Sequence, residues 1–215
     1  DPQGHGTFVT TVCTGGACGI PAADHGHAYG AQIASYSVTD YISGGTPFAF
    51  FSTVASAWQQ ITADRLTFNI VAANNSFNSP SDPTHFVQQA LDQCALTADV
   101  LICVSAGNDG PAAGTGRQAC VNGLAVGAVL PGSDAVTSWS SRGPVLGDPT
   151  RTYPDIAACT YSVTAYPDCE STYWPFRGTS NASPQVCAAA TLLRAQVPTL
   201  RADETKAILL ASTLD

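Results

Sequence analysis

Short apolar runs alternate along this chain with longer segments that have helical periodicity. The runs expected to form strands are residues 31–38, 66–73, 99–106 and 123–130. The segments expected to form helices are residues 47–63, 83–97, 178–197 and 202–212. Strands that alternate with helices of this length usually pair in parallel, because each crossover helix returns the chain to the same end of the sheet. The pattern therefore predicts an α/β fold with a largely parallel central sheet and helices on both faces.

The size and charge of the chain exclude several classes of partner. Its 215 residues suffice for one compact domain, residues 1–215, with a sizeable core. The formal net charge is −8 and the few basic residues are scattered, so no basic stripe could follow a phosphate backbone. No uninterrupted apolar run has the length of a membrane-spanning helix. Nucleic acids and membranes are therefore not expected as partners.

Eight cysteines indicate a secreted protein or another oxidising compartment. They lack the paired CxxC spacing of zinc sites, and an even set of this kind favours disulfides. Cys13 with Cys18, and Cys159 with Cys169, are close enough in sequence to close small loops. The alternative is that some thiols are free and buried, above all Cys187, which lies on an apolar helix.

Three short motifs carry side chains that could act together in catalysis. In GHGT, two glycines flank His5 at a helix entrance, where the imidazole can serve as a base near neutral pH. In SAGNDG, Asn108 follows a buried strand and can point its amide into a cleft. In GTSNASP, Ser180 lies where a loop becomes a helix, and the N–H groups and dipole of that helix favour a negatively charged oxygen.

Each motif also has an ordinary structural interpretation. His5 could be an exposed turn histidine, Asn108 could merely adopt a left-handed turn, and Ser180 could be the N-cap of its helix. These interpretations are the better ones for each motif alone. The catalytic interpretation depends on all three motifs occurring together.

The motifs occur along the chain in the order HGT, N-x-S, AGN and GTSxASP. With this order the chain resembles the subtilisin-like serine proteases (subtilases, peptidase S8) over nearly its whole length. The resemblance implies the three-layer subtilisin-like fold. It also implies a role for each residue: His5 is the general base, Asn108 donates to the oxyanion, and Ser180 attacks the peptide carbonyl. A serine hydroxyl needs such a base and such donors, because it is a weak nucleophile on its own.

The resemblance also implies substrate-binding residues. One wall of the cleft is expected to pair with an extended protein or peptide substrate as an added strand, and it comprises Asn75, Ser76, Phe77 and Asn78. The opposite wall of the pocket for the residue before the scissile bond is expected to comprise Val104, Ser105 and Ala106. Asp1 matches an acid of the family that lines the cleft.

The triad acid of the family has no counterpart here. The family supplies it from a strand well before the histidine, and no such strand precedes His5. Asp1 matches a different acid, so it is not assigned to the triad. We therefore expect the N-terminal part of the fold to be missing from this chain. A segment cleaved from the same precursor, retained as a second chain, would supply the first strand and the aspartate.

Three functions are compatible with this pattern. The leading one is a secreted serine endopeptidase; the others are a peptide ligase that uses the same acyl-enzyme and a non-catalytic domain that binds peptides. The resemblance implies no cofactor for catalysis. A structural calcium ion is compatible with it, but no loop of alternating acids identifies a site, and no other metal site is expected.

Overall fold

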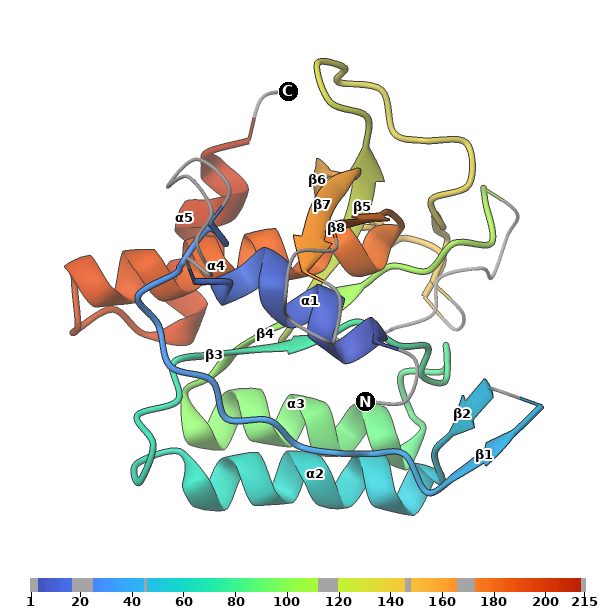
Figure 1. Cartoon of the computed structure of the whole chain (residues 1–215). Helices are drawn as coiled ribbons and strands as arrows, with labels where there is room; N and C mark the ends of the chain where they lie inside the picture. The colour runs from blue at the N-terminus through green and yellow to red at the C-terminus, as the bar shows by residue number, and fades with distance from the viewer. Residues whose placement is uncertain are drawn as a thin grey trace.

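Four parallel strands form the central sheet of the computed structural model (Figure 1). Their order is β3-β4-β5-β6, and their bounds are Ala72–Asn75, Leu101–Ser105, Leu124–Val129 and Ile156–Cys159. Two antiparallel pairs lie outside this sheet: β1 (Tyr41–Ser43) with β2 (Thr46–Phe48), and β7 (Ser162–Ala165) with β8 (Tyr173–Phe176). The structure describes residues 4–16, 25–44, 46–111, 120–145, 148–165 and 173–213.

Helices cover both faces of the sheet. They are α1 (His5–Thr14), α2 (Phe51–Asp64), α3 (Phe86–Ala98), α4 (Thr179–Gln196) and α5 (Ala202–Ala211). In Figure 1, α2 and α3 lie below the sheet, and α1, α4 and α5 lie above it. Among the described residues, no helix is long and apolar enough to cross a membrane. The expected three-layer α/β architecture is confirmed.

Alternate residues of β4 point to the two helical layers. Ile102 and Val104 pack in the core shared with α2 and α3, whereas Leu101 and Cys103 pack in the core shared with α4 and α5. All four side chains are at most 1 % exposed. A strand buried on both faces needs such a continuous apolar run, which is the pattern that the sequence shows.

Most predicted elements are present with small shifts. β4, β5 and the four predicted helices lie within or close to their expected ranges, but β3 begins at Ala72, near the end of the run predicted over 66–73. Asn69 has a φ of 50°, so a turn occupies the start of that run. The fourth strand, β6, was not predicted, because none of its four residues is fully buried and the segment has no alternation of apolar and polar residues.

The prediction of a strand over residues 31–38 is wrong. This segment is extended but forms no ladder with another strand, and β3 is the edge of the sheet on this side. The sequence has the composition of a strand, but a strand also needs a neighbour at pairing distance. The segment instead runs past β3 and leads into the β1–β2 hairpin (Figure 1).

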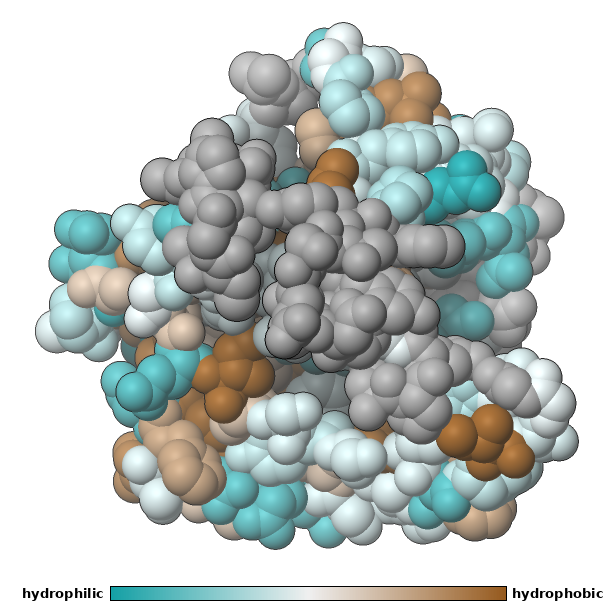
Figure 2. Space-filling view, in the orientation of Figure 1, coloured by the Kyte–Doolittle hydropathy of each residue, from teal (hydrophilic) through white to brown (hydrophobic). Residues whose placement is uncertain are grey.

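The β1–β2 hairpin is held by aromatic contacts on its surface. Tyr41 and Phe48 are register partners, and their rings stack at 5.3 Å with an interplanar angle of 11°. Ile42 beside them is 48 % exposed. Figure 2 shows apolar side chains gathered over the hairpin, at the lower right of the molecule. Cross-strand aromatic pairs of this kind stabilise a short two-stranded ribbon.

The described cysteines form no disulfide. Those within the described parts of the chain are all free thiols: Cys13, Cys94, Cys103, Cys120, Cys159 and Cys187. Cys18 and Cys169, the predicted partners of Cys13 and Cys159, lie outside the described residues. Cys187 is 4 % exposed, as the alternative of a buried thiol expects.

One buried guanidinium joins the layers at the amino ends of the strands. Arg194 on α4 is 4 % exposed, and its Nη2 lies 2.6 Å from Oδ2 of Asp99. Its Nη1 donates to the carbonyl oxygens of Val71 and Asp99, which precede β3 and β4. Oδ1 of Asp99 accepts from the N–H of Ala202, the first residue of α5. A single ion pair thus fixes two strands and two helices.

Replacement of this cation should destabilise the fold. Arg194→Met removes two hydrogen bonds to backbone carbonyls and the ion pair with the partly exposed carboxylate of Asp99, and it should lower the free energy of unfolding by about 2–4 kcal/mol in urea denaturation. The control is Arg201→Met, which breaks an exposed pair with Asp203 at 3.0 Å and should have a far smaller effect. Equal effects of the two substitutions would contradict the role given to Arg194.

Candidate active site

The start of α4 requires an unusual backbone. Gly178 has a φ of 108°, a conformation that residues with a side chain rarely adopt. A Cβ atom at this position would lie 3.4 Å from Nδ2 of Asn108, so the side chain of Asn108 also needs the glycine. The N–H of Gly178 donates to Oγ1 of Thr160 at 2.9 Å. Gly178 therefore allows both the backbone turn that begins α4 and the close approach of the Asn108 side-chain amide to that turn.

The side-chain amide of Asn108 is held in one orientation. Its Oδ1 accepts from the backbone N–H of Thr179 at 2.9 Å and from the Thr179 hydroxyl at 3.0 Å. The same hydroxyl oxygen accepts from the N–H of Gly107 at 3.1 Å. Because the amide oxygen is occupied by two donors, the NH₂ group is the part left to serve a ligand.

Ser180 meets the predicted substrate wall directly. Its hydroxyl donates to the carbonyl oxygen of Ser76 at 3.0 Å, and the hydroxyl of Ser76 donates to the carbonyl oxygen of Ser180 at 3.2 Å. Asn74 Nδ2 donates to the Ser76 hydroxyl at 2.9 Å, and Ser183 donates to Asn74 Oδ1 at 2.6 Å. These bonds join segments about a hundred residues apart, so the end of β3 and the start of α4 form one unit.

The four residues predicted for this wall differ in their exposure. Asn75 and Ser76 are buried, Phe77 is half-buried against the core shared with α2 and α3, and Asn78 is exposed. Ser180 is 9 % exposed. The wall therefore runs from the nucleophile candidate outwards to solvent.

His5 lies against the strand that leads into the helix of Ser180. It is the first residue of α1, and its ring meets the ring of Phe176 edge-on, with centroids 5.7 Å apart. Phe176 ends β8, shortly before α4 begins. Burial lowers the pKa of the His5 imidazole, which favours the neutral form that can accept a proton.

Within the described residues, His5 and Ser180 are not hydrogen-bonded to each other. The Ser180 hydroxyl instead donates to Ser76. Transfer of its proton to the imidazole would need this bond to Ser76 to break, and hydrogen bonds between catalytic groups are often long or poorly aligned in apo sites. The structure thus bonds Asn108 to Thr179 and Ser76 to Ser180, and it places His5 against Phe176, four residues before Ser180.

The residues predicted for the opposite wall are buried. Val104 and Ala106 have no exposed surface, and Ser105 is 3 % exposed. Val104 and Ala106 pack into the core beneath the sheet. These residues lead into the loop that carries Asn108, and their role in the opposite wall stays a prediction. Asp1, the other predicted cleft residue, lies outside the described residues.

Three functional contacts were missed by the sequence analysis. Thr179 orients the amide of Asn108, Thr160 holds Gly178, and Phe176 buries His5. Thr179 stands inside the GTS motif, so its position beside Ser180 could have suggested a role. Thr160 and Phe176 carry no local signal, because their contacts join separate segments.

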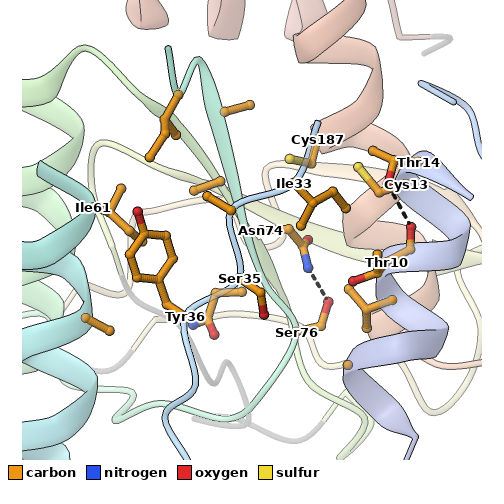
Figure 3. A pocket seen from close by; sticks show the side chains of 18 of the residues that line it. Thr10, Cys13, Thr14, Ile33, Ser35, Tyr36, Ile61, Asn74, Ser76 and Cys187 are labelled. Carbon is orange, nitrogen blue, oxygen red and sulfur yellow. Dashed lines mark hydrogen bonds between the residues drawn. The ribbon is translucent and has the colours of Figure 1, made fainter. Parts of the chain in front are cut away.

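A deep slot lies between β3 and the extended segment 31–39. Its volume is about 1870 Å³, larger than the roughly 300–1,000 Å³ of ordinary ligand pockets. Residues 31–39 line one side and residues 70–75 the other, and α2 and α1 also contribute. Figure 3 shows Tyr36 on the extended segment, Asn74 on β3, and Cys13 on α1 around this slot.

The edge of β3 presents backbone groups to the slot. The N–H of Leu101 donates to the carbonyl oxygen of Val71 at 3.2 Å. In a parallel strand, alternate residues direct their backbone N–H and C=O groups to the same neighbouring strand. The backbone groups of Val71 and Ala73 therefore face β4, and those of Ala72 and Asn74 face away from β4, towards the slot. Trp58, which also lines the slot, has a buried indole N–H without an acceptor in the described part of the chain.

Metal ions in proteins require groups of ligating side chains. No group of three or more His, Cys, Asp or Glu side chains within the described ranges could hold a metal ion.

Comparison with known proteins identifies relatives over almost the entire chain. A profile of the Subtilase family matches residues 1–214. The chain is 31 % identical over 201 residues to subtilisin-like protease 9 of Arthroderma gypseum, covering 91 % of this chain and 44 % of that protein. It is 29 % identical over 235 residues to subtilisin-like protease PopC of Myxococcus xanthus, covering 100 % and 46 %. It is 30 % identical over 219 residues to subtilisin DY of Bacillus licheniformis, covering 96 % and 69 %.

A solved structure supports the same relationship. The S41 psychrophilic protease superimposes with a TM-score of 0.79 at 26 % identity, over 96 % of this chain and 68 % of that one. The chain spans less than half the length of the first two relatives and about two thirds of subtilisin DY.

The environment of His5 can be tested by titration. In an NMR titration of the folded chain, the His5 imidazole should titrate below the ordinary histidine value of about 6.5. Phe176→Leu should raise this pKa, because a smaller side chain lets water reach the ring. The control Phe86→Leu removes a ring that stacks on His85 instead, and it should leave the His5 pKa unchanged. A His5 pKa above the ordinary value in the unmodified chain would contradict this description.

Proposed function

The chain belongs to the subtilase family, and from this premise we propose that residues 1–215 form a single peptidase domain of a secreted serine endopeptidase. The observation that carries the proposal is the contact between Asn108 and the start of α4. It joins a fixed amide donor to the residue next to Ser180. Such an arrangement suits acyl transfer, in which a nucleophile and an oxyanion donor must face the same carbonyl.

In the first step Ser180 attacks the peptide carbonyl. His5 accepts the hydroxyl proton as Oγ forms a bond to the carbonyl carbon. The negative charge that develops on the carbonyl oxygen is stabilised by Nδ2 of Asn108 and by the backbone N–H of Ser180 at the start of α4. The neutral form of His5, favoured by burial, is the form that this step requires.

In the second step the peptide bond breaks. The imidazolium of His5 gives its proton to the leaving amine, and the acyl group remains on Ser180. Water then attacks the acyl group while His5 takes its proton, and the same two donors hold the second oxyanion. Subtilases need no cofactor for this chemistry. We assign no ligands to a structural calcium ion.

The substrate is a protein or peptide bound in extended form along residues 75–78. Ser76 is hydrogen-bonded to Ser180, so a strand placed beside this wall brings its carbonyl group to the hydroxyl. Phe77 is half-buried at the wall and suits an apolar side chain of the substrate. Asn78, exposed at the outer end, contacts residues further from the scissile bond.

The carboxylate that orients His5 is proposed to come from a separate segment. An extended segment that fills the slot would pair with Ala72 and Asn74 and would bring an aspartate towards α1. The volume of the slot and the buried indole N–H of Trp58 support an occupant with backbone acceptors. We propose that this segment is an upstream part of the same precursor, separated by zymogen processing and retained as a second chain.

Secretion is proposed from the cysteine content. The eight thiols of a chain without CxxC spacing suit an oxidising compartment, in which disulfides form and persist. Secretion also provides a reason for processing of a precursor, because proteolytic activity is then released outside the cell.

The nucleophile can be tested with a fluorophosphonate probe on the protein in its natural length. The probe should modify Ser180, and Ser180→Ala should abolish labelling. The substitution should also lower kcat/KM by at least about 10³-fold, a size taken from variants of related enzymes and not from this structure. Ser56→Ala, at an exposed serine of α2, is the control and should retain labelling and activity.

The same experiment distinguishes the other two functions. A non-catalytic peptide-binding domain would bind peptides without labelling, which would contradict the proposal. A peptide ligase would be labelled by the probe, but it would transfer the acyl group to an added amine in preference to water. Product analysis with and without that amine separates hydrolysis from ligation.

Hydrogen exchange tests the occupant of the slot. In the natural protein the amides of Ala72 and Asn74 should exchange slowly, because the added strand protects them, whereas in residues 1–215 alone they should exchange quickly. The amide of Ala73, which faces β4, is the internal control and should be protected in both samples. Fast exchange of Ala72 and Asn74 in the natural protein would contradict a strand in the slot.

A further inference from the structure

The residue directly after Ser180 is a buried amide that is bonded to other segments. Asn181 has no exposed surface. Its Nδ2 donates to the backbone carbonyl oxygen of Phe176 at 3.1 Å. Its Oδ1 accepts from the hydroxyl of Ser162 at 3.1 Å and from Nε2 of Gln185 at 2.8 Å. Both acceptor positions of the amide oxygen are therefore used, which fixes the orientation of the amide.

These bonds tie the end of the β7–β8 hairpin to the first turn of α4. Ser162 and Phe176 are register partners at that end of the hairpin, and the Asn181 amide bonds to both of them. Gln185, about one turn further along α4, also donates to the carbonyl oxygen of Cys159, the last residue of β6, at 2.6 Å. The connection therefore extends from the hairpin through α4 to the central sheet.

Phe176 continues this connection to the helix of His5. The Phe176 side chain packs with Phe8 and Val12 of α1 in a small buried cluster, and its ring meets the ring of His5 edge-on. The carbonyl oxygen of the same residue is the acceptor for Asn181. A shift of the amide would therefore move the residue that supports the imidazole relative to the helix that carries the hydroxyl of Ser180.

The polar character of Asn181 is costly at a fully buried position. Burial of an amide is unfavourable unless protein hydrogen bonds replace those to water. An apolar side chain of similar volume would avoid this cost, but it could make none of the three side-chain bonds. The property that asparagine adds here is thus a fixed connection between segments, and not packing alone.

We propose that Asn181 is a positioning residue that holds the hydroxyl of Ser180 and the imidazole of His5 in register with each other. Its side chain acts through Phe176 and takes no part in bond making. The inference rests on the proposed function, in which His5 accepts the proton of Ser180. Because a displacement of about 1 Å can slow such a step by about 10²-fold, loss of the connection should slow acylation. Binding of the substrate along residues 75–78 should change little.

The test is the rate at which a fluorophosphonate probe labels Ser180 in the protein in its natural length, together with kcat and KM for a peptide substrate. Asn181→Leu removes all three bonds without adding a charge. It should lower the labelling rate and kcat by about 10–100-fold and leave KM within about twofold. Asn122→Leu makes the same chemical change at a half-buried residue just before β5, at the other end of the sheet, and should leave all three quantities unchanged.

A second variant keeps the shape of the side chain and removes only its donor. At about pH 9 the carboxylate introduced by Asn181→Asp is ionised, so it can accept from Ser162 and Gln185 but cannot donate to Phe176. The loss of labelling rate should match that of Asn181→Leu. This variant decides alone if Asn181→Leu does not fold, and a labelling rate equal to that of the unmodified protein would overturn the proposal.

A double-mutant cycle separates positioning from a general structural role. If Asn181 acts through Phe176, each Asn181 substitution should cost less than about threefold in a Phe176→Leu background, where the ring that meets His5 is absent. The full loss in that background would overturn the proposal, although labelling of the unmodified protein would leave the proposed function intact. An unmodified protein that is not labelled at Ser180 would instead contradict the proposed function, and this role with it.

Discussion

The hydrogen bonds between Asn108 and Thr179 are the contact on which the rest of the site depends. They connect the loop after β4 to the first residue of α4, and the glycine at position 178 leaves just enough space for them. Because Oδ1 of Asn108 accepts two hydrogen bonds from Thr179, Nδ2 of Asn108 is the atom left to donate to a ligand. The same turn presents Ser180 to Ser76. One short turn therefore positions the nucleophile candidate, the oxyanion donor and the substrate wall relative to one another.

Rigid surroundings make this contact possible. β4 is buried on both faces, and Arg194 fixes the amino ends of β3 and β4 to α4 and α5. The loops at the carboxyl ends of the strands, where parallel sheets hold their functional groups, are therefore carried by an ordered base. The opposite holds beside β3, where the slot leaves one edge of the sheet without a ladder partner in the described structure. α1, with His5, is one of the elements that line this slot.

The sequence predicts those features that depend on local pattern. Apolar runs and helical periodicity locate β4, β5 and the long helices, and the HGT, AGN and GTSxASP motifs locate His5, Asn108 and Ser180 at the start of α1, after β4 and at the start of α4. Features that depend on distant partners are not predicted. Residues 31–38 have strand composition but no neighbour, and the edge-on contact of His5 with Phe176 joins segments that no local rule connects. The burial of Val104 and Ala106 similarly follows from packing against helices and not from the local motif.

The most direct test of the central claim is a crystal structure of the protein with a peptide boronic acid bound. The account predicts a tetrahedral boron on Oγ of Ser180, with one boronate oxygen within hydrogen-bond distance of both Nδ2 of Asn108 and the backbone N–H of Ser180, and Oδ1 of Asn108 still bound to Thr179. An adduct on another residue, or a boronate oxygen that points away from an unchanged Asn108, would contradict it.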